Sequence, residues 1–160
     1  MRKNSVAMEI PPTSYLYSLR HATAVDAGII HQIIASVQIN PISLNWRRFV
    51  LAINQEGRII GCGQVKPHGD GSRELASIAV LPDWRGMGIA RRIIEHLLEQ
   101  YPGTLYLTCR SQLGPLYQKF GFQTIQRAEM PPYFQRLSRI VALFNKLFRR
   151  PDQLLVMKRI

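Results

Sequence analysis

The segment between residues 74 and 100 constrains the fold of this chain most strongly. An apolar run from Glu74 to Leu81 predicts a buried strand that ends at Pro82. Glycines follow at positions 86 and 88. Apolar side chains then recur at helical spacing and predict a helix to about Gln100: Ile89, Ile93 and Leu97, flanked by Ala90, Ile94 and Leu98. A strand that passes through a glycine-containing loop into an amphipathic helix is typical of α/β layered domains.

The remaining segments alternate in the same way. Strands are expected at residues 15–19, 49–53, 58–65, 104–108, 122–126 and 154–157, which with 74–81 makes about seven. Helices are expected at residues 25–37, 115–120 and 134–148. The segment 23–26 has the pattern of a capping box, and 54–57 that of a hairpin turn. The order predicts one α/β domain over residues 15–160, preceded by a flexible arm at residues 1–14.

Composition narrows the class of protein and of partner. The 160 residues are 46% hydrophobic and carry a formal net charge of +11, which favours an anionic partner. That partner is a phosphorylated cofactor, an acidic protein, a nucleic acid or an anionic membrane surface. No apolar run is long enough for a membrane span. Cys62 and Cys109 lack CxxC spacing, so we expect two reduced thiols in a cytoplasmic protein. The four histidines are scattered along the sequence, so we expect no metal site.

The loop around Gly86 and Gly88 has the chemistry of a phosphate site. The first turn of a helix leaves about four backbone amides without intrahelical partners, and the helix dipole adds positive potential there. A pyrophosphate uses both features, and glycine lets it approach the backbone closely. The alternative is a glycine-rich turn that binds nothing. The segment matches neither the Rossmann GxGxxG pattern nor the P-loop pattern.

The stretch from Val80 to Ala90 resembles the acyl-CoA signature of the GNAT N-acetyltransferase superfamily. The family pattern R/Q-x-x-G-x-G/A is met by Arg85, Gly88 and Ala90. By element order the resemblance covers residues 15–128, and the terminal strand also suits the family. It implies a mixed, twisted sheet flanked by helices, in which the parallel strands 74–81 and 104–108 splay apart to admit CoA.

The resemblance also implies how acetyl-CoA is held. The pantetheine arm would pair with the backbone at Ile78 and Val80, and the amides of residues 85–90 would bind the pyrophosphate. Many family members have Asn seven residues before the tyrosine of the LYxKxGF segment, whereas this chain has Arg110, which could instead reach a phosphate or an acidic acceptor. The expected CoA-binding residues are Ile78, Ala79, Val80, Arg85, Gly86, Met87, Gly88, Ile89, Ala90 and Arg110.

Acetyl transfer to an amine needs a base, an oxyanion donor and an acid for the leaving thiolate. An alkylamine is almost wholly protonated at neutral pH, so a base is useful. The segment 115–122 resembles the family's LYxKxGF segment, which implies Tyr117 as the acid; a tyrosine packed on the core is the alternative. Glu74, four residues before Ile78, is the candidate base, or a strand carboxylate paired with Arg73. The amide of Val80 would be the oxyanion donor.

Residues 130–150 form a basic amphipathic segment before the last strand. One helical face carries Phe134, Leu137, Val141, Phe144 and Phe148, with Ile140 and Leu147 beside it. The other face carries Arg136, Arg139, Lys146, Arg149 and Arg150. Such a helix can lie on a membrane or bind a partner, but we expect its apolar face to pack on its own sheet. Tyr133, Phe134 and Trp46 are candidates to line the acceptor site.

The sequence therefore predicts an enzyme that moves an acetyl group from acetyl-CoA to a primary amine by direct attack in a ternary complex. The acceptor would be a protein lysine, a protein N-terminus or a small amine. The positive charge is compatible with an acidic partner protein, and the enzyme would be a monomer or homodimer. A non-catalytic acyl-CoA sensor on the same fold is the alternative. A nucleic-acid-binding module is suggested by charge alone, without any matching motif, so no nucleic acid is expected.

Overall fold

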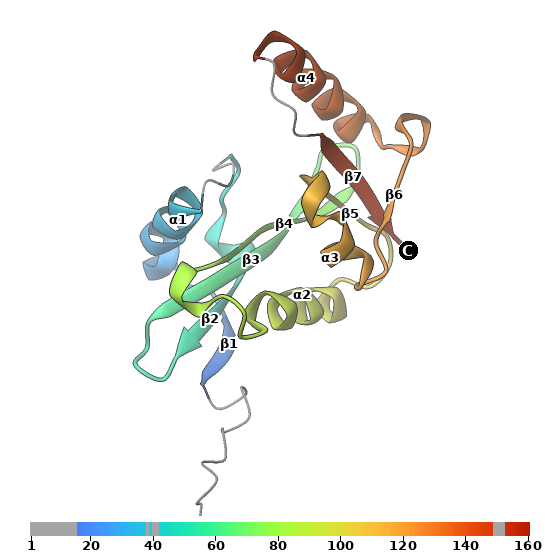
Figure 1. Cartoon of the computed structure of the whole chain (residues 1–160). Coiled ribbons are helices and arrows are strands. Elements are labelled where there is room, and N and C mark those ends of the chain that lie inside the picture. The colour runs from blue at the N-terminus through green and yellow to red at the C-terminus, as the bar shows by residue number, and fades with distance from the viewer. Residues whose placement is uncertain (1–15, 38, 40–41, 149–152) are drawn as a thin grey trace, which may run out of the picture.

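A mixed sheet of seven strands, in the order β1-β2-β3-β4-β5-β7-β6, organises the computed structural model (Figure 1). The structure describes residues 16–37, 39, 42–148 and 153–160, so the predicted arm at 1–14 lies outside the described residues. The strands are β1 Tyr17–His21, β2 Phe49–Asn54, β3 Ile59–Pro67, β4 Arg73–Val80, β5 Leu105–Arg110, β6 Gln123–Thr124 and β7 Leu154–Arg159. The α-helices are α1 Ala27–Ser36, α2 Ile89–Gln100, α3 Gly114–Gln118 and α4 Pro132–Phe148.

The predicted α/β fold class is confirmed, including its parallel pair. Strands β4 and β5 run parallel, and the other neighbouring strands run antiparallel. Alternate side chains of each strand point to opposite faces. In β2, Val50 and Ala52 pack with α2, whereas Phe49 and Leu51 pack with α1. The two helices therefore cover opposite faces of one sheet.

The start of α1 differs from the predicted pattern. The capping box at Thr23 is present, but it begins a 3₁₀ turn, and α1 itself starts only at Ala27. Asp26 is buried and accepts hydrogen bonds from Thr23 and from both terminal nitrogens of Arg20. The buried stripe of the helix is consequently Ile30, Ile33 and Ile34. Val25 and Ile29 share the four-residue apolar spacing of Ile33 and Val37, but they are 86% and 45% exposed.

A bulge in β4 reverses the direction in which its side chains point. The pairing of β3 with β4 shifts by one residue, and Ser77 has a positive φ of 57° within the strand. The buried Gln64 side-chain amide donates to the Ser77 hydroxyl at 2.9 Å. Leu75 and Ile78 both pack on the α2 side as a result. Glu74 therefore points to the face opposite Ile78, although an unbroken strand would put residues four apart on the same face.

The glycine at position 63 lets α2 pack closely on β3. A Cβ at Gly63 would lie 2.6 Å from Ile78 Cδ1 and 2.7 Å from Ile93 Cγ2. We expect Gly63→Ala to lower the free energy of unfolding by about 1–3 kcal/mol through overpacking. Gly28→Ala is the control, because a Cβ on that residue of α1 meets nothing within 4 Å. Denaturant unfolding curves measure both; an unchanged midpoint for Gly63→Ala would contradict this packing.

Helix α4 covers the sheet less than the sequence predicts. Phe134 is fully buried, but Ile140, Leu143, Phe144 and Leu147 are 55%, 68%, 58% and 72% exposed. Figure 1 shows why: α4 starts beside β7 and its later turns extend away from the sheet. The expectation that its apolar face packs on the sheet thus holds for the first turns only. Arg149 and Arg150 lie outside the described residues, as does the side chain of Phe148.

Candidate active site

The loop before α2 presents an open, amide-lined surface. Gly86 and Gly88 adopt left-handed φ angles of 79° and 75°, and Gly88 caps α2 without a side-chain hydrogen bond. Within the described residues, the amides of residues 86–91 donate to no backbone carbonyl. An added Cβ at either glycine would meet nothing within 4 Å. The loop can therefore accept a group that brings its own hydrogen-bond acceptors.

The basic residues around this loop are held in different ways. The Arg85 Nε donates to the Val80 carbonyl at 3.3 Å, which folds that side chain back toward the end of β4. Arg91 pairs with Glu95 one turn along α2, with 2.7 Å between Nε and Oε1. Arg92 is exposed. All three add positive potential near the start of α2.

Strands β4 and β5 meet only near their first residues. Their register contains the single pair Glu74 and Tyr106, although β4 continues to Val80 and β5 to Arg110. On its other side β4 stays paired with β3 as far as Val80. The edge of β4 that faces β5 therefore has no ladder partner beyond the first pair, within the described part of the chain. Arg110 is exposed at the end of β5.

Tyr117 lies on α3, on the same side as α2. Its ring is half-buried against the main core cluster and meets Phe122 edge to face, with 6.3 Å between ring centroids. Burial, with a smaller contribution from Cys109, raises the pKa of Tyr117 to about 12. The phenol consequently keeps its proton at neutral pH. Cys109 is buried, its thiol contacts Met157 Sδ at 3.9 Å, and burial raises its pKa.

Glu74 is a buried carboxylate with two side-chain partners. It is 5% exposed. Thr108 of β5 donates its hydroxyl proton to Oε1 at 3.1 Å, and the His68 Nε2 lies 2.9 Å from Oε2. The cross-strand neighbour Lys66 adds a positive charge nearby, and burial lowers the pKa of Lys66. The hydroxyl and the imidazole together hold the carboxylate in one orientation.

His68 is the functional candidate that the sequence does not reveal. It follows β3, and its ring stacks on Tyr133 with 3.5 Å between centroids and 15° between planes. The ring of Phe134 meets it edge on at 5.6 Å. The signal that could have found it is the hairpin formed by β3 and β4. Because Lys66 pairs with Glu74 across this hairpin, the connecting loop that contains His68 lies near Glu74. The spacing of residues along the sequence does not show this proximity.

Asp70 ties this cluster to α4. Its carboxylate accepts from the Tyr133 amide at 2.8 Å, at the exposed start of α4, and so caps that helix from the β3–β4 loop. It also accepts from the hydroxyl and amide of Ser72. The Ser72 hydroxyl is the main reason that the pKa of Asp70 falls to about 2. This cap holds Tyr133 against His68, beside Glu74.

The three predicted acceptor-site residues occupy different environments. Tyr133 is half-buried in the cluster around Glu74, whereas Phe134 is completely buried beneath it, against Tyr106, Ile125 and Val156. Trp46 is half-buried against the α1-side core, with the Arg47 guanidinium 4.3 Å from its ring centroid. The structure thus brings Tyr133 to Glu74 and puts Phe134 under that surface.

A metal-binding cluster and a membrane-spanning helix are both absent from the described residues. They contain no group of three or more His, Cys, Asp or Glu side chains arranged to hold a metal ion. None of the helices in that part of the chain is both long and apolar enough to span a membrane. Cys62 and Cys109 are both buried free thiols.

Comparison with known proteins identifies the family of this chain. The family model described as "Acetyltransferase (GNAT) domain" matches residues 45–124, which include β2 to β6 and the glycine loop. The chain belongs to the GNAT acetyltransferase family. No curated protein gives a significant match to the sequence.

Solved structures share this fold at low sequence identity. N-acetylglutamate synthase from Neisseria gonorrhoeae, complexed with CoA and N-acetyl-glutamate, has a TM-score of 0.69 and 20% identity. The match covers 89% of this chain and 34% of that enzyme, so the chain spans about a third of its length. The Mycobacterium tuberculosis protein Rv2747 in complex with CoA gives 0.66 and 19%, with 89% and 98% covered. An Arabidopsis thaliana protein with the bisubstrate analogue CoA-Ac-MVNAL gives 0.58 and 16%, with 90% and 97% covered.

Proposed function

We propose that this chain transfers the acetyl group of acetyl-CoA to a primary amine by direct attack in a ternary complex. The observation that carries the proposal is the position of Glu74. The bulge at Ser77 turns its carboxylate to the face opposite the side chains of Ile78 and Val80. Glu74 can therefore act as the base for an amine that approaches on its own face of the sheet, while the gap between β4 and β5 receives the thioester.

The residues present fit CoA. The amides of residues 86–90 and the open space above Gly86 and Gly88 suit a pyrophosphate, whereas the expected Arg85 amide already donates to the Pro82 carbonyl. The edge of β4 at Ile78 to Val80 faces β5 without a ladder partner in the described residues, so it suits a pantetheine arm that pairs like an added strand. Arg110 lies exposed at the end of β5 and is suited to a phosphate or an acidic acceptor.

The chain supplies a chemical group for each step of the transfer. Glu74 takes the proton from the ammonium form of the acceptor, directly or through water, so that the nitrogen lone pair can attack the thioester carbonyl. The Val80 amide donates to the oxygen that becomes negative as the new C–N bond forms. The C–S bond then breaks, Tyr117 gives its phenolic proton to the leaving thiolate, and the second proton of the attacking nitrogen passes through water to restore the phenol. A phenol that stays neutral at pH 7 is suited to that role.

The acceptor is an amine that reaches the surface beside Tyr133. Among the structural relatives, one was solved with N-acetyl-glutamate and another with the bisubstrate analogue CoA-Ac-MVNAL. A net charge of +11 disfavours small polycationic amines and suits an amine on an acidic protein, such as a lysine side chain or an N-terminus. Tyr133 and Trp46 would contact the acceptor, with Phe134 supporting Tyr133 from below. The buried free thiols fit a cytoplasmic location.

Incubation with labelled acetyl-CoA tests the proposed function. Purified protein is added to a cell extract, and mass spectrometry locates newly labelled amines. We expect labelled lysines or N-termini that are absent when the protein is heat-inactivated. Binding of CoA without any labelled product, in the extract or with a panel of small amines, would instead favour the sensor interpretation.

Removal of the Tyr117 hydroxyl tests the assignment of the acid. We expect Tyr117→Phe to lower kcat by about 10²-fold or more, because the thiolate then leaves unprotonated. Its affinity for CoA stays unchanged, since the ring keeps its packing against Phe122. Tyr101→Phe is the control: Tyr101 packs on the same core from the end of α2. Unchanged turnover for Tyr117→Phe would remove this residue from the mechanism.

A further inference from the structure

Helix α4 carries an exposed apolar strip that the acetyltransferase site does not use. The strip consists of Ile140, Leu143, Phe144 and Leu147, each more than half exposed. At 100° per residue these four positions fall within a sector of roughly 100° around the helix. The buried residue Phe134 lies outside that sector. The strip therefore faces away from the sheet, on the part of α4 that extends beyond it (Figure 1).

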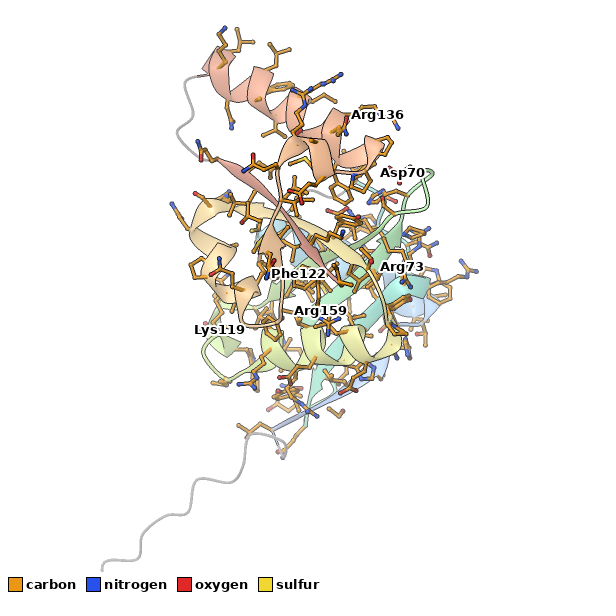
Figure 2. All side chains as sticks on the ribbon, turned by 90° about the vertical axis from the view of Figure 1, so that its right-hand side faces the viewer. Asp70, Arg73, Lys119, Phe122, Arg136 and Arg159 are labelled. Carbon is orange, nitrogen blue, oxygen red and sulfur yellow. The ribbon has the colours of Figure 1, made fainter. Side chains whose placement is uncertain are left out.

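Basic side chains border this apolar strip. Arg136 and Arg139 precede it and are exposed, and Lys146 lies at its side in the last turn. Figure 2 shows Arg136 on the outer surface of α4. The sequence of α4 contains no acidic residue at all. An amphipathic helix with a wholly basic polar border and aliphatic and aromatic apolar residues matches the chemistry of helices that lie in the interface of anionic bilayers.

We propose that α4 docks on the surface of an anionic membrane, with its axis parallel to the bilayer. The strip would enter the boundary between headgroups and acyl chains, and Arg136, Arg139 and Lys146 would contact lipid phosphates. A second copy fits the strip less well, because two α4 helices packed face to face would bring their basic borders together. The formal net charge of +11 adds attraction to an anionic surface.

Docking would also fix where the acceptor site lies. The first turn of α4 carries Tyr133, which stacks on His68 beside Glu74. A helix held in the interface therefore keeps the acceptor side of the enzyme close to the membrane. Membrane docking of α4 does not depend on the acetyltransferase chemistry and can be measured without CoA or turnover.

Vesicle flotation of the full chain tests the proposal. One set of vesicles is phosphatidylcholine alone, and the other contains phosphatidylglycerol as well. We expect the protein to float with the anionic vesicles, not with the neutral ones, and to be released as salt screens the attraction. Failure to float with anionic vesicles at low salt would overturn the proposal.

Matched variants distinguish the contribution of α4 to vesicle binding from the contribution of the overall charge. The double change Leu143→Ser and Leu147→Ser should weaken partitioning by about tenfold or more, because two apolar anchors are lost. Val25→Ser and Ile29→Ser, which alter exposed apolar residues of the α1 region, should leave it unchanged. Arg139→Glu with Lys146→Glu should weaken binding more than Lys119→Glu, an exposed site on the other side of the fold.

Three results would assign the strip elsewhere and overturn the proposal. One is equal vesicle binding by the Leu143→Ser, Leu147→Ser variant and the wild type. Another is a wild-type dimer in light scattering that the same variant converts to monomer, which would make the strip an interface between copies. The third is saturable binding to an acidic polypeptide without binding to anionic vesicles. Circular dichroism of each variant verifies that the fold is retained.

Discussion

The change Glu74→Gln is expected to lower kcat for acetyl transfer by about 10²–10⁴-fold, the range for loss of a general base. Glutamine has nearly the same size and can still accept from the Thr108 hydroxyl, whose oxygen lies 3.1 Å from Glu74 Oε1. It cannot take a proton from the incoming ammonium group. Because Glu74 points away from the side of β4 that carries Ile78 and Val80, CoA affinity should not change.

The position of the carboxylate makes this test selective. Glu74 is 5% exposed and contacts His68 and Thr108, so its loss is not confused with a general change of surface charge. Glu99→Gln provides the control, because Glu99 is exposed on α2. Initial rates at saturating acetyl-CoA measure both variants, and calorimetry verifies cofactor binding. If Glu74→Gln turned over as fast as Glu99→Gln, the proton would have to leave by another route.

The second large effect is expected from Gly88→Glu, which should weaken CoA binding by about 100-fold or more. Gly88 has a φ of 75°, a conformation that costs a non-glycine residue roughly 1–2 kcal/mol. Its missing Cβ faces open space beside the amides that start α2. A glutamate there fills that space and places a negative charge where the pyrophosphate would bind, against the helix dipole.

The glycine loop could be predicted from sequence because its signals are local. One continuous stretch of chain contains all of them: the strand that ends at Pro82, the two glycines, and the helical periodicity from Ile89 to Leu97. The structure places α2 at Ile89–Gln100, as this periodicity predicts. Tyr117 likewise falls on a short helix closed by Gly121, whose φ of 84° suits a left-handed cap.

The surroundings of Glu74 could not be predicted because they depend on contacts between distant segments. His68 and Asp70 reach Tyr133 only through the β3–β4 hairpin and the docking of α4, more than sixty residues later in the chain. The bulge at Ser77 has no local signature, since serine rarely adopts a positive φ. Apolar periodicity also does not indicate whether the sheet is large enough to cover an amphipathic helix. The later turns of α4 extend beyond the sheet, so their apolar side chains stay exposed.

Calorimetric titration of CoA into three proteins tests the central claim most directly. The wild type and Gly28→Glu, which adds the same charge to an open position on α1, should bind CoA with equal affinity. Gly88→Glu should give no measurable heat at the same concentrations. Absence of binding by the wild type, or binding by Gly88→Glu as tight as that of Gly28→Glu, would contradict the claim that the start of α2 holds the cofactor.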